Sequence, residues 1–229
     1  MGNDIMQQIG KIKCLVVEPE IGPSSATKTI ILFHGFGADA YDLQSLSEAN
    51  QTPWPTRWIF PQGPLEVPIG PGWTGRAWWP IDINNMTALK DLSEVEPPAL
   101  NKLRPQITEM LTQLKTPLSE IILGGFSQGA MLATDSFLRC DPAAAGLIIF
   151  SGNLLCKNAW SALAPKHAGQ KFFMTHGSQD MILPVSGAQR LETLLTQAGL
   201  KGRLQSFGGG HEIPPQAIRA AEKFLAAEI

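Results

Sequence analysis

The sequence predicts an α/β fold with a mainly parallel central sheet and helices on both faces. Short apolar runs recur along the chain, and several are continuous and rich in β-branched residues, as in strands buried on both faces. Segments with apolar residues at a spacing of three to four lie between these runs and are typical of amphipathic helices. The alternation of strand and helix patterns favours a parallel sheet.

The expected strands follow one another from the N-terminal to the C-terminal part of the chain. They are the runs at 13–18, 29–33, 57–60, 120–124, 146–150, 171–175 and 203–207. The expected helices span 99–114, 129–139 and 185–198, with a last one after Pro214–Pro215. Pro105 falls inside the first of these helices, where a proline can introduce a kink.

One segment breaks this rhythm. Residues 53–80 hold seven of the 18 prolines and five of the six tryptophans. So many prolines argue against regular structure, so the segment is expected to be a loop region rich in tryptophan and proline. Tryptophan is unfavourable in water, which suggests that this loop packs over the mouth of a site.

Composition and charge narrow the class of protein. At 229 residues, with 44% hydrophobic and 17% charged residues, the chain suits a single globular domain, 1–229. The formal net charge of −2 gives no basic excess for holding nucleic acid. Three scattered cysteines suggest neither a disulfide framework nor a zinc site. With no signal peptide and no integral membrane segment in the sequence, the expected location is cytoplasmic.

The stretch Gly125–Gly129 reads GFSQG and matches the pattern G-x-S-x-G between a strand and a helix. In that context the pattern forms a tight turn that presents its serine at the edge of a sheet. The flanking glycines leave room for the bend, and Ser127 is the expected nucleophile. A plain glycine-rich turn with a solvated serine is the alternative.

A serine nucleophile needs a base. His211 follows the last strand, on the loop GGGHEIPP, and is the preferred candidate. His34 closes an early strand and is the alternative, whereas His167 precedes a strand and lies at the wrong end of the sheet. His176 also closes a strand, and no catalytic role is predicted for it.

The base needs an acid to orient it. Asp180 follows the sixth strand, and the order Ser127, Asp180, His211 is the one expected of this architecture. A helix-capping role is the alternative for Asp180. Asp135 is expected to face away from the turn, and Asp141 reads as a turn residue.

Two backbone groups are expected to form an oxyanion hole: the N–H of Gln128, which comes with the turn, and the N–H of Phe36, in the loop HGFGAD. Trp73, Trp78 and Trp79 are candidate substrate-binding residues, with core packing as the alternative for each. No cofactor and no metal are expected.

Together these stretches resemble the phospholipase/carboxylesterase family of α/β-hydrolases, which includes the acyl-protein thioesterases and small bacterial carboxylesterases. The resemblance rests on HGFGAD (34–39), PQGP (61–64), GGFSQGAML (124–132), HGSQDMILP (176–184) and GGGHEIPP (208–215). It implies an α/β-hydrolase fold and a Ser127–Asp180–His211 esterase whose substrate is a small-molecule or lipid-like acyl ester, such as a lysophospholipid or a protein thioester. Family members often show a Trp-Phe-Asp stretch where this chain reads AWWPID, from Ala77 to Asp82, so substrate choice is not inherited with the fold.

Other classes of protein fit less well. Residues 35–40 match the dinucleotide pattern G-x-G-x-x-A, but no acidic residue follows between Glu48 and Glu66 to bind a ribose. A metallohydrolase using His34, His176 and His211 lacks an H-E-x-x-H motif. A non-catalytic ligand-binding domain that kept the fold is the remaining alternative.

Overall fold

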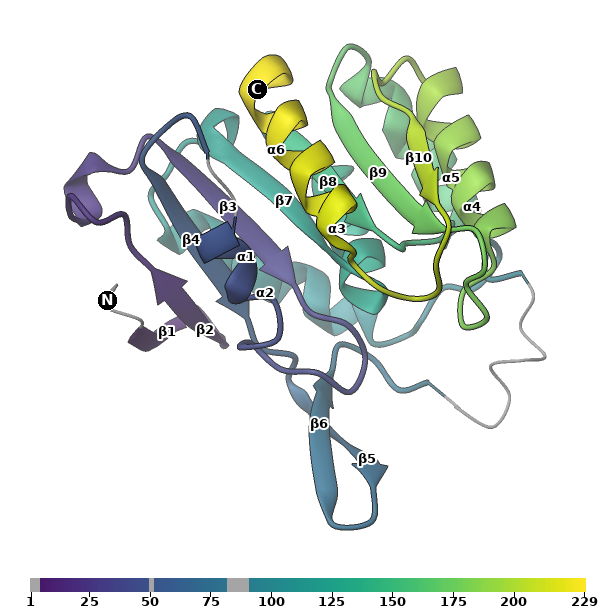
Figure 1. Ribbon diagram of the computed structural model, residues 1–229, viewed down its shortest axis with the longest axis horizontal. Helices are drawn as coiled ribbons and strands as arrows, with labels where there is room; N and C mark the ends of the chain where they lie inside the picture. The colour runs from purple at the N-terminus through teal and green to yellow at the C-terminus, as the bar shows by residue number, and fades with distance from the viewer. Residues whose placement is uncertain (1–4, 50–51, 82–90) are drawn as a thin grey trace.

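The computed structural model describes residues 5–49, 52–81 and 91–229, and a single large sheet runs through it (Figure 1). Its strands are β1 (Ile5–Ile9), β2 (Ile12–Val17), β3 (Lys28–Phe33), β4 (Thr56–Pro61), β7 (Ile121–Phe126), β8 (Gly146–Phe150), β9 (Phe172–Gly177) and β10 (Leu204–Phe207). They lie in the order β1-β2-β4-β3-β7-β8-β9-β10. The pairs β1–β2 and β2–β4 are antiparallel and all other neighbours are parallel, so the predicted mainly parallel sheet is confirmed.

Six α-helices are described around this sheet. They are α1 (Ser45–Ala49), α2 (Leu100–Gln113), α3 (Gln128–Phe137), α4 (Lys157–Leu163), α5 (Val185–Gln197) and α6 (Pro215–Glu228). Short 3-10 turns occur at η1 (Pro23–Ser25), η3 (Leu118–Glu120) and η4 (Ala164–His167). The four predicted helices correspond to α2, α3, α5 and α6, and α2 continues through Pro105 as one helix.

The alternation of side chains along the strands divides the core into two layers. In β3, Ile31 and Phe33 belong to the layer that contains buried residues of α2, α3, α4 and α5. Ile30 and Leu32, on the opposite face, join the layer that contains buried residues of α1 and α6. Successive residues of a strand point to opposite faces, so a continuous apolar run is what a strand covered by helices on both faces requires. Figure 1 shows α6 lying across the near face of the sheet.

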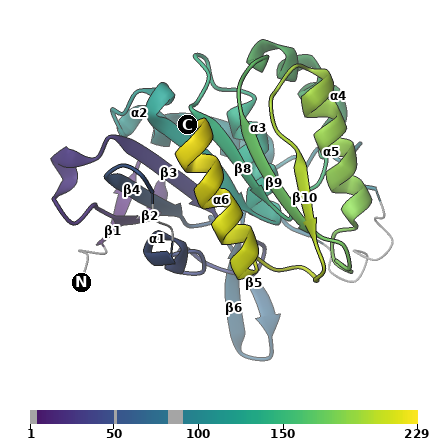
Figure 2. The same cartoon turned by 45° about the horizontal axis from the view of Figure 1, so that its top comes forward.

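The segment 53–80 is not irregular, and this part of the prediction was wrong. It contains β4 and a separate antiparallel hairpin formed by β5 (Leu65–Gly70) and β6 (Trp73–Ala77). The prolines fit because Pro61 ends β4 and Pro68 lies at an irregularity of a two-stranded sheet, positions where a missing backbone N–H is tolerated. Figures 1 and 2 show the hairpin projecting from the body of the molecule.

The carboxyl ends of the parallel strands meet at one edge of the sheet. Phe33 at the end of β3 pairs with Gly125 in β7, and Phe207 at the end of β10 pairs with Gly177 in β9. The loops that follow β3, β7, β9 and β10 therefore lie along that edge, where ligands bind in open α/β sheets. Because this one sheet takes strands from residue 5 to residue 207, we infer that the described residues form one domain.

Within the described ranges, no helix combines the length and the apolar character that crossing a bilayer requires.

Candidate active site

Ser127 occupies a strained backbone conformation at the turn from β7 to α3. Its φ of 54° and ψ of −119° fall in a region that residues with a side chain rarely adopt. The turn is held by a hydrogen bond from the Ser127 N–H to the Phe150 carbonyl, at 2.9 Å. A side chain at Gly125 or Gly129 would overlap the backbone at Phe33, so these glycines are a steric requirement of the bend.

Ser127, His211 and Asp180 come together at the carboxyl edge of the sheet. His211 Nε2 lies 2.8 Å from Ser127 Oγ, and His211 Nδ1 lies 2.6 Å from Asp180 Oδ2. Because the carboxylate can only accept, Nδ1 carries the hydrogen and Nε2 is left to accept the Ser127 hydroxyl proton. The Phe126 ring lies 4.7 Å from the His211 imidazole, measured between centroids, and supports it from the side.

Asp180 is buried and held by hydrogen bonds on both carboxylate oxygens. Oδ1 accepts the N–H groups of Ile182 and Leu183, at 2.9 and 2.8 Å. Burial opposes its ionisation, but hydrogen bonds from His176, His211 and the Leu183 N–H outweigh this effect and hold the pKa of Asp180 well below its usual range. The two bonds on Oδ1 close the turn that precedes α5, but the N-cap of that helix is Pro184 and no side chain caps it, so the alternative helix-capping role of Asp180 is wrong.

His34, the alternative base, is buried with both ring nitrogens engaged by backbone groups. Nε2 accepts the Gly63 N–H at 2.9 Å, so the hydrogen resides on Nδ1, which donates to the Gly35 carbonyl at 2.7 Å. Burial lowers the pKa of His34, mainly through desolvation. His34 therefore joins two loops and has no nitrogen free to take a proton from Ser127.

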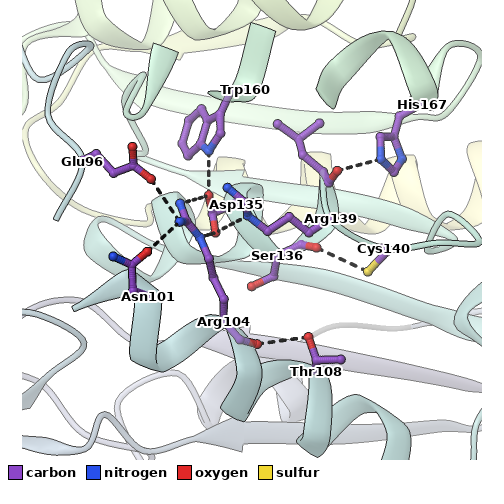
Figure 3. Close-up of polar contacts among 11 residues, drawn as sticks. Glu96, Asn101, Arg104, Thr108, Asp135, Ser136, Arg139, Cys140, Trp160 and His167 are labelled. Atoms are coloured by element: carbon purple, nitrogen blue, oxygen red, sulfur yellow. Dashed lines mark hydrogen bonds and ion pairs between the residues drawn. The ribbon is translucent and has the colours of Figure 1, made fainter. Parts of the chain in front are cut away.

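Asp135, an alternative acid, lies in a network of polar contacts with Arg104, Arg139 and Trp160 (Figure 3). Its carboxylate accepts two hydrogen bonds from Arg104, at 2.9 and 3.0 Å, one from Arg139 at 3.1 Å and one from Trp160 Nε1 at 2.9 Å. The remaining Arg104 nitrogen, Nη1, donates to Glu96 at 3.0 Å and to Asn101 at 3.4 Å. The prediction that Asp135 faces away from Ser127 agrees with this placement, and Asp141 is exposed beyond α3.

Two backbone N–H groups flank Ser127 without an acceptor in the described part of the chain: those of Phe36 and Gln128. Gln128 is the first residue of α3, where N–H groups have no intrahelical partner and favour negative charge. The loop of Phe36 is braced by β6, because the Gly37 N–H donates to the Arg76 carbonyl at 2.8 Å and the Arg76 N–H donates to the Ala38 carbonyl at 2.7 Å. Both N–H groups are available to an oxyanion next to Ser127.

A cavity of about 630 Å³ opens beside Ser127 and His211. Its walls are mainly apolar, and Glu96 supplies a carboxylate at its border. The apolar lining includes Phe36, Trp79, Ile81, Leu92, Val95, Pro97, Pro98, Met131, Leu155, Ile182 and Leu183. A volume of this size suits a small ligand with an extended apolar part.

The three candidate tryptophans separate into three environments. Trp79 lines the cavity and stays a predicted substrate-binding residue. Trp78 is fully buried and does not line it: its Nε1–H donates to the His34 carbonyl at 2.9 Å, so it is a core residue. Trp73 is 72% exposed at the start of β6 and lies outside the cavity lining, so the predicted roles of Trp73 and Trp78 in the pocket are corrected.

The side chain of Gln128 has a function that the sequence reasoning missed. Its Oε1 accepts the Trp78 N–H and its Nε2 donates to the Trp79 carbonyl, both at 2.9 Å. The side chain thus fastens the segment after β6 to the start of α3. Only the position of Gln128 in the G-x-S-x-G pattern could have drawn attention to it, and that pattern prescribes no residue there.

The cavity wall at 92–99 was missed too, because it has no periodic pattern and precedes α2 as an irregular stretch. Asp82, the acidic residue of the AWWPID stretch, lies outside the described residues. The cysteines offer no competing nucleophile: Cys14, Cys140 and Cys156 are buried, and burial raises their thiol pKa values to about 12, 11 and 12.

Comparison with known proteins places the chain in a family. A family model described as phospholipase/carboxylesterase matches residues 13–229. Acyl-protein thioesterase 1 of Eremothecium gossypii is 27% identical over 210 residues, which cover 89% of this chain and 89% of that protein. The protein of the same name from Kluyveromyces lactis is 30% identical over 167 residues, covering 70% and 72% of the two chains.

Solved structures of esterases are also similar to this chain. The crystal structure of esterase PE8 superposes with a TM-score of 0.79 at 27% identity, covering 93% of this chain and 97% of that one. The Bacillus cereus carboxylesterase, with a TM-score of 0.67 at 18% identity over 93% of each chain, shares the fold. The chain therefore belongs to the phospholipase/carboxylesterase family of α/β-hydrolases and is a carboxylic ester hydrolase.

Proposed function

We propose that Ser127, His211 and Asp180 are the catalytic triad of a serine esterase that works through an acyl-enzyme intermediate. The observation that carries this proposal is the continuous hydrogen-bonded chain from Ser127 Oγ through the His211 imidazole to Asp180, at 2.8 and 2.6 Å, beside an apolar cavity. The strained backbone of Ser127 supports it, because such strain is found where a structure must hold a functional side chain in place.

In the first step Ser127 Oγ attacks the acyl carbonyl carbon while His211 Nε2 takes the hydroxyl proton. Asp180 stabilises the resulting imidazolium. The negative charge on the former carbonyl oxygen lies between the N–H groups of Phe36 and Gln128. His211 then gives its proton to the leaving alkoxide or thiolate as the tetrahedral intermediate breaks down.

In the second step water enters where the alcohol or thiol has left. His211 takes a proton from this water, whose oxygen attacks the acyl carbon of the Ser127 ester. Breakdown of the second tetrahedral intermediate releases the carboxylic acid and returns the proton to Ser127 Oγ. The steps balance without a cofactor, because one ester and one water give one acid and one alcohol.

The substrate class that we propose is an ester or thioester with an apolar acyl group. The mainly apolar cavity beside Ser127 supports an acyl chain of lipid-like character. The relatives named acyl-protein thioesterase 1 add thioesters to the candidates. Lysophospholipids have the same combination of an apolar chain and an ester.

A fluorophosphonate probe tests the nucleophile. We expect one covalent adduct on wild-type protein, mapped by mass spectrometry to the peptide that contains Ser127, and no adduct on Ser127→Ala. Labelling at another residue, or full ester hydrolysis by Ser127→Ala, would overturn the assignment. Matched acetyl, hexanoyl and dodecanoyl esters and thioesters, compared by kcat/KM, then rank the substrate classes.

A further inference from the structure

Asp180 is contacted by two histidines, of which the mechanism above uses only one. His176, near the end of β9, is fully buried. Its Nε2 lies 2.7 Å from the Leu183 carbonyl oxygen and 3.2 Å from Asp180 Oδ2. Both of these oxygens are acceptors, so the His176 ring must carry its hydrogen on Nε2. The single Nε2–H of His176 is shared: it donates to the Leu183 carbonyl, and Asp180 Oδ2, which accepts from His211, is a second and longer contact of the same nitrogen.

We propose that His176 is a positioning residue for ester hydrolysis, which fixes the direction and the hydrogen-bonding strength of the Asp180 carboxylate through its Nε2–H. The proposal rests on the proposed function of Ser127, His211 and Asp180. It concerns a residue that has no contact with Ser127 and acts through the Asp180 carboxylate and the turn that carries it.

The geometry around Asp180 favours this role of His176. Asp180 lies in the turn between β9 and α5, where a carboxylate on a short loop can rotate. The N–H groups of Ile182 and Leu183 hold Oδ1, and His176 is the donor from the sheet itself that faces Oδ2. By bonding the Leu183 carbonyl as well, His176 ties the far end of the turn to the end of β9. A rigid strand thus sets the position of the oxygen that meets His211.

The charge of the Asp180 carboxylate depends on the same contact. A carboxylate oxygen that accepts a second hydrogen bond has part of its charge compensated, and it becomes a weaker base. Asp180 then stabilises protonated His211 less strongly than a singly bonded carboxylate would. The depressed pKa of Asp180, to which the His176 hydrogen bond contributes despite the opposing effect of burial, agrees with this reasoning.

Two other ionisable groups lie near the site, and neither has a hydrogen bond or ion pair with His176 in the described part of the chain. Glu212 follows His211 and is exposed. Glu96 borders the cavity and pairs with Arg104. A shift in pH dependence after substitution of His176 therefore reports on the Asp180–His211 pair.

The chain contains a matched control in His167. It is also buried, at 3% exposure, and its Nε2 contacts a backbone carbonyl, that of Leu138, at 3.0 Å. In both histidines Nδ1 has no partner within the described residues. The difference is the carboxylate: His176 has Asp180 beside its N–H, whereas the nitrogen of His167 has only the carbonyl among the described residues.

The test compares His176→Leu, His176→Gln, His176→Asn, His167→Leu and Asp180→Asn with the wild type. Each variant is assayed for kcat and for the pH profile of kcat/KM on an activated aryl ester, and its folding is checked by thermal denaturation. The glutamine amide nitrogen reaches roughly the position of Nε2 and can donate to Asp180, whereas the asparagine amide ends near the position of Nδ1 and falls short.

We expect His176→Leu to lower kcat about 10- to 100-fold, as loss of a supporting hydrogen bond at an active site does. The acidic limb of the profile should move to higher pH by at least about half a unit, because Asp180 with one donor fewer stabilises the protonated base more strongly. His176→Gln should restore kcat and the position of the acidic limb. His167→Leu should lower only the melting temperature. If His176→Leu does not fold, the contrast between the Gln and Asn variants carries the same test.

A wild-type acidic limb and kcat in His176→Leu, or identical profiles for the Gln and Asn variants, would overturn the positioning role. Asp180→Asn separates this result from failure of the proposed function. Low activity of Asp180→Asn alongside an unchanged His176→Leu removes only the positioning role, whereas near-normal activity of Asp180→Asn removes the triad itself.

Discussion

The side-chain amide of Gln128 donates a hydrogen bond to the carbonyl of Trp79, at 2.9 Å, and so ties a wall of the cavity to the residue after the nucleophile. The same amide accepts the Trp78 N–H. Gln128 therefore has two separable functions: its backbone N–H faces the site, and its side chain holds the segment that carries Trp79.

Replacing Gln128 with methionine should separate these functions. The change keeps the side-chain volume and the backbone N–H, but it leaves the Trp78 N–H and the Trp79 carbonyl without partners. Two unsatisfied buried groups predict a loss of about 2–4 kcal/mol in the free energy of unfolding. Urea denaturation measures the loss, and an ester panel should show a larger drop in kcat/KM for dodecanoyl than for acetyl esters. An unchanged free energy of unfolding would mean that water replaces the two hydrogen bonds of the Gln128 side chain.

The protein should be more stable with glycine than with alanine at position 127. Both substitutions remove the hydroxyl group and abolish ester hydrolysis, but only glycine relieves the strained φ of 54°. We expect Ser127→Gly to exceed Ser127→Ala by about 1 kcal/mol in the free energy of unfolding. Parallel denaturation of the two variants measures the difference, and equal stabilities would show that the turn relaxes once the hydroxyl is gone.

Asp180→Asn should lower kcat by about 1,000- to 10,000-fold. The asparagine amide can accept a hydrogen bond from His211 Nδ1, but it lacks the negative charge of the carboxylate, which stabilises the imidazolium. Steady-state kinetics with an activated ester provide the measurement, and fluorophosphonate labelling should slow in parallel. Asp141→Asn, at an exposed position, serves as the control and should leave both rates unchanged.

Trp79→Ala should change the preference for acyl chain length, because Trp79 lines the cavity. We expect weaker discrimination between hexanoyl and dodecanoyl esters, read as the ratio of their kcat/KM values. Trp73→Ala, at an exposed position, is the matched control and should leave that ratio unchanged. In contrast, Trp78→Ala should destabilise the protein by about 3–5 kcal/mol as a core truncation.

The Asp135 network should make stability fall in acid. Burial opposes ionisation of Asp135, but hydrogen bonds from Arg104, Trp160 and Arg139 outweigh it and lower the pKa of Asp135 in the folded protein. An unfolded aspartate titrates at about 3.9. Between these two values the unfolded chain binds more protons, so the free energy of unfolding rises with pH.

The contribution of Asp135 is therefore complete above about pH 5 and is lost as the pH falls through the folded-state pKa. We expect Asp135→Asn to be about 3 kcal/mol less stable than the wild type at neutral pH. This gap should narrow below about pH 4. Urea titrations at several pH values test both statements, and a gap independent of pH would contradict the ionic origin of the stabilisation.

The sequence predicted the six strands that lie inside the sheet because their apolar runs are continuous, and it also predicted the edge strand β10. It did not predict β1, whose side chains are largely exposed, or the hairpin of β5 and β6, whose prolines resemble those of a loop. A strand that is buried on both faces must have a continuous apolar run, so its sequence pattern identifies it. At the edges, strand pairing is set by neighbours that are distant in sequence.

The candidate site shows the same division. Ser127, Asp180 and His211 could be selected because each follows a recognisable strand at the same edge of the sheet. The environments of Trp73, Trp78 and Trp79 could not, because three residues within one segment point to solvent, core and cavity. The proximity of His176 to Asp180 depends on the path of a turn, and a His-Gly pair at the end of a strand gives no indication of it.

The side chains of His34, Trp78 and Gln128 join the loops around Ser127 to one another through hydrogen bonds to backbone groups. Such cross-links limit how far these loops can drift apart while the enzyme is empty. The N–H groups that we propose as oxyanion donors are thus already in place before an ester arrives, so they should add little reorganisation energy to the barrier. Differences in kcat/KM among esters should then arise chiefly from how the acyl chain fits the cavity, because the contribution of the reacting groups is the same for each ester.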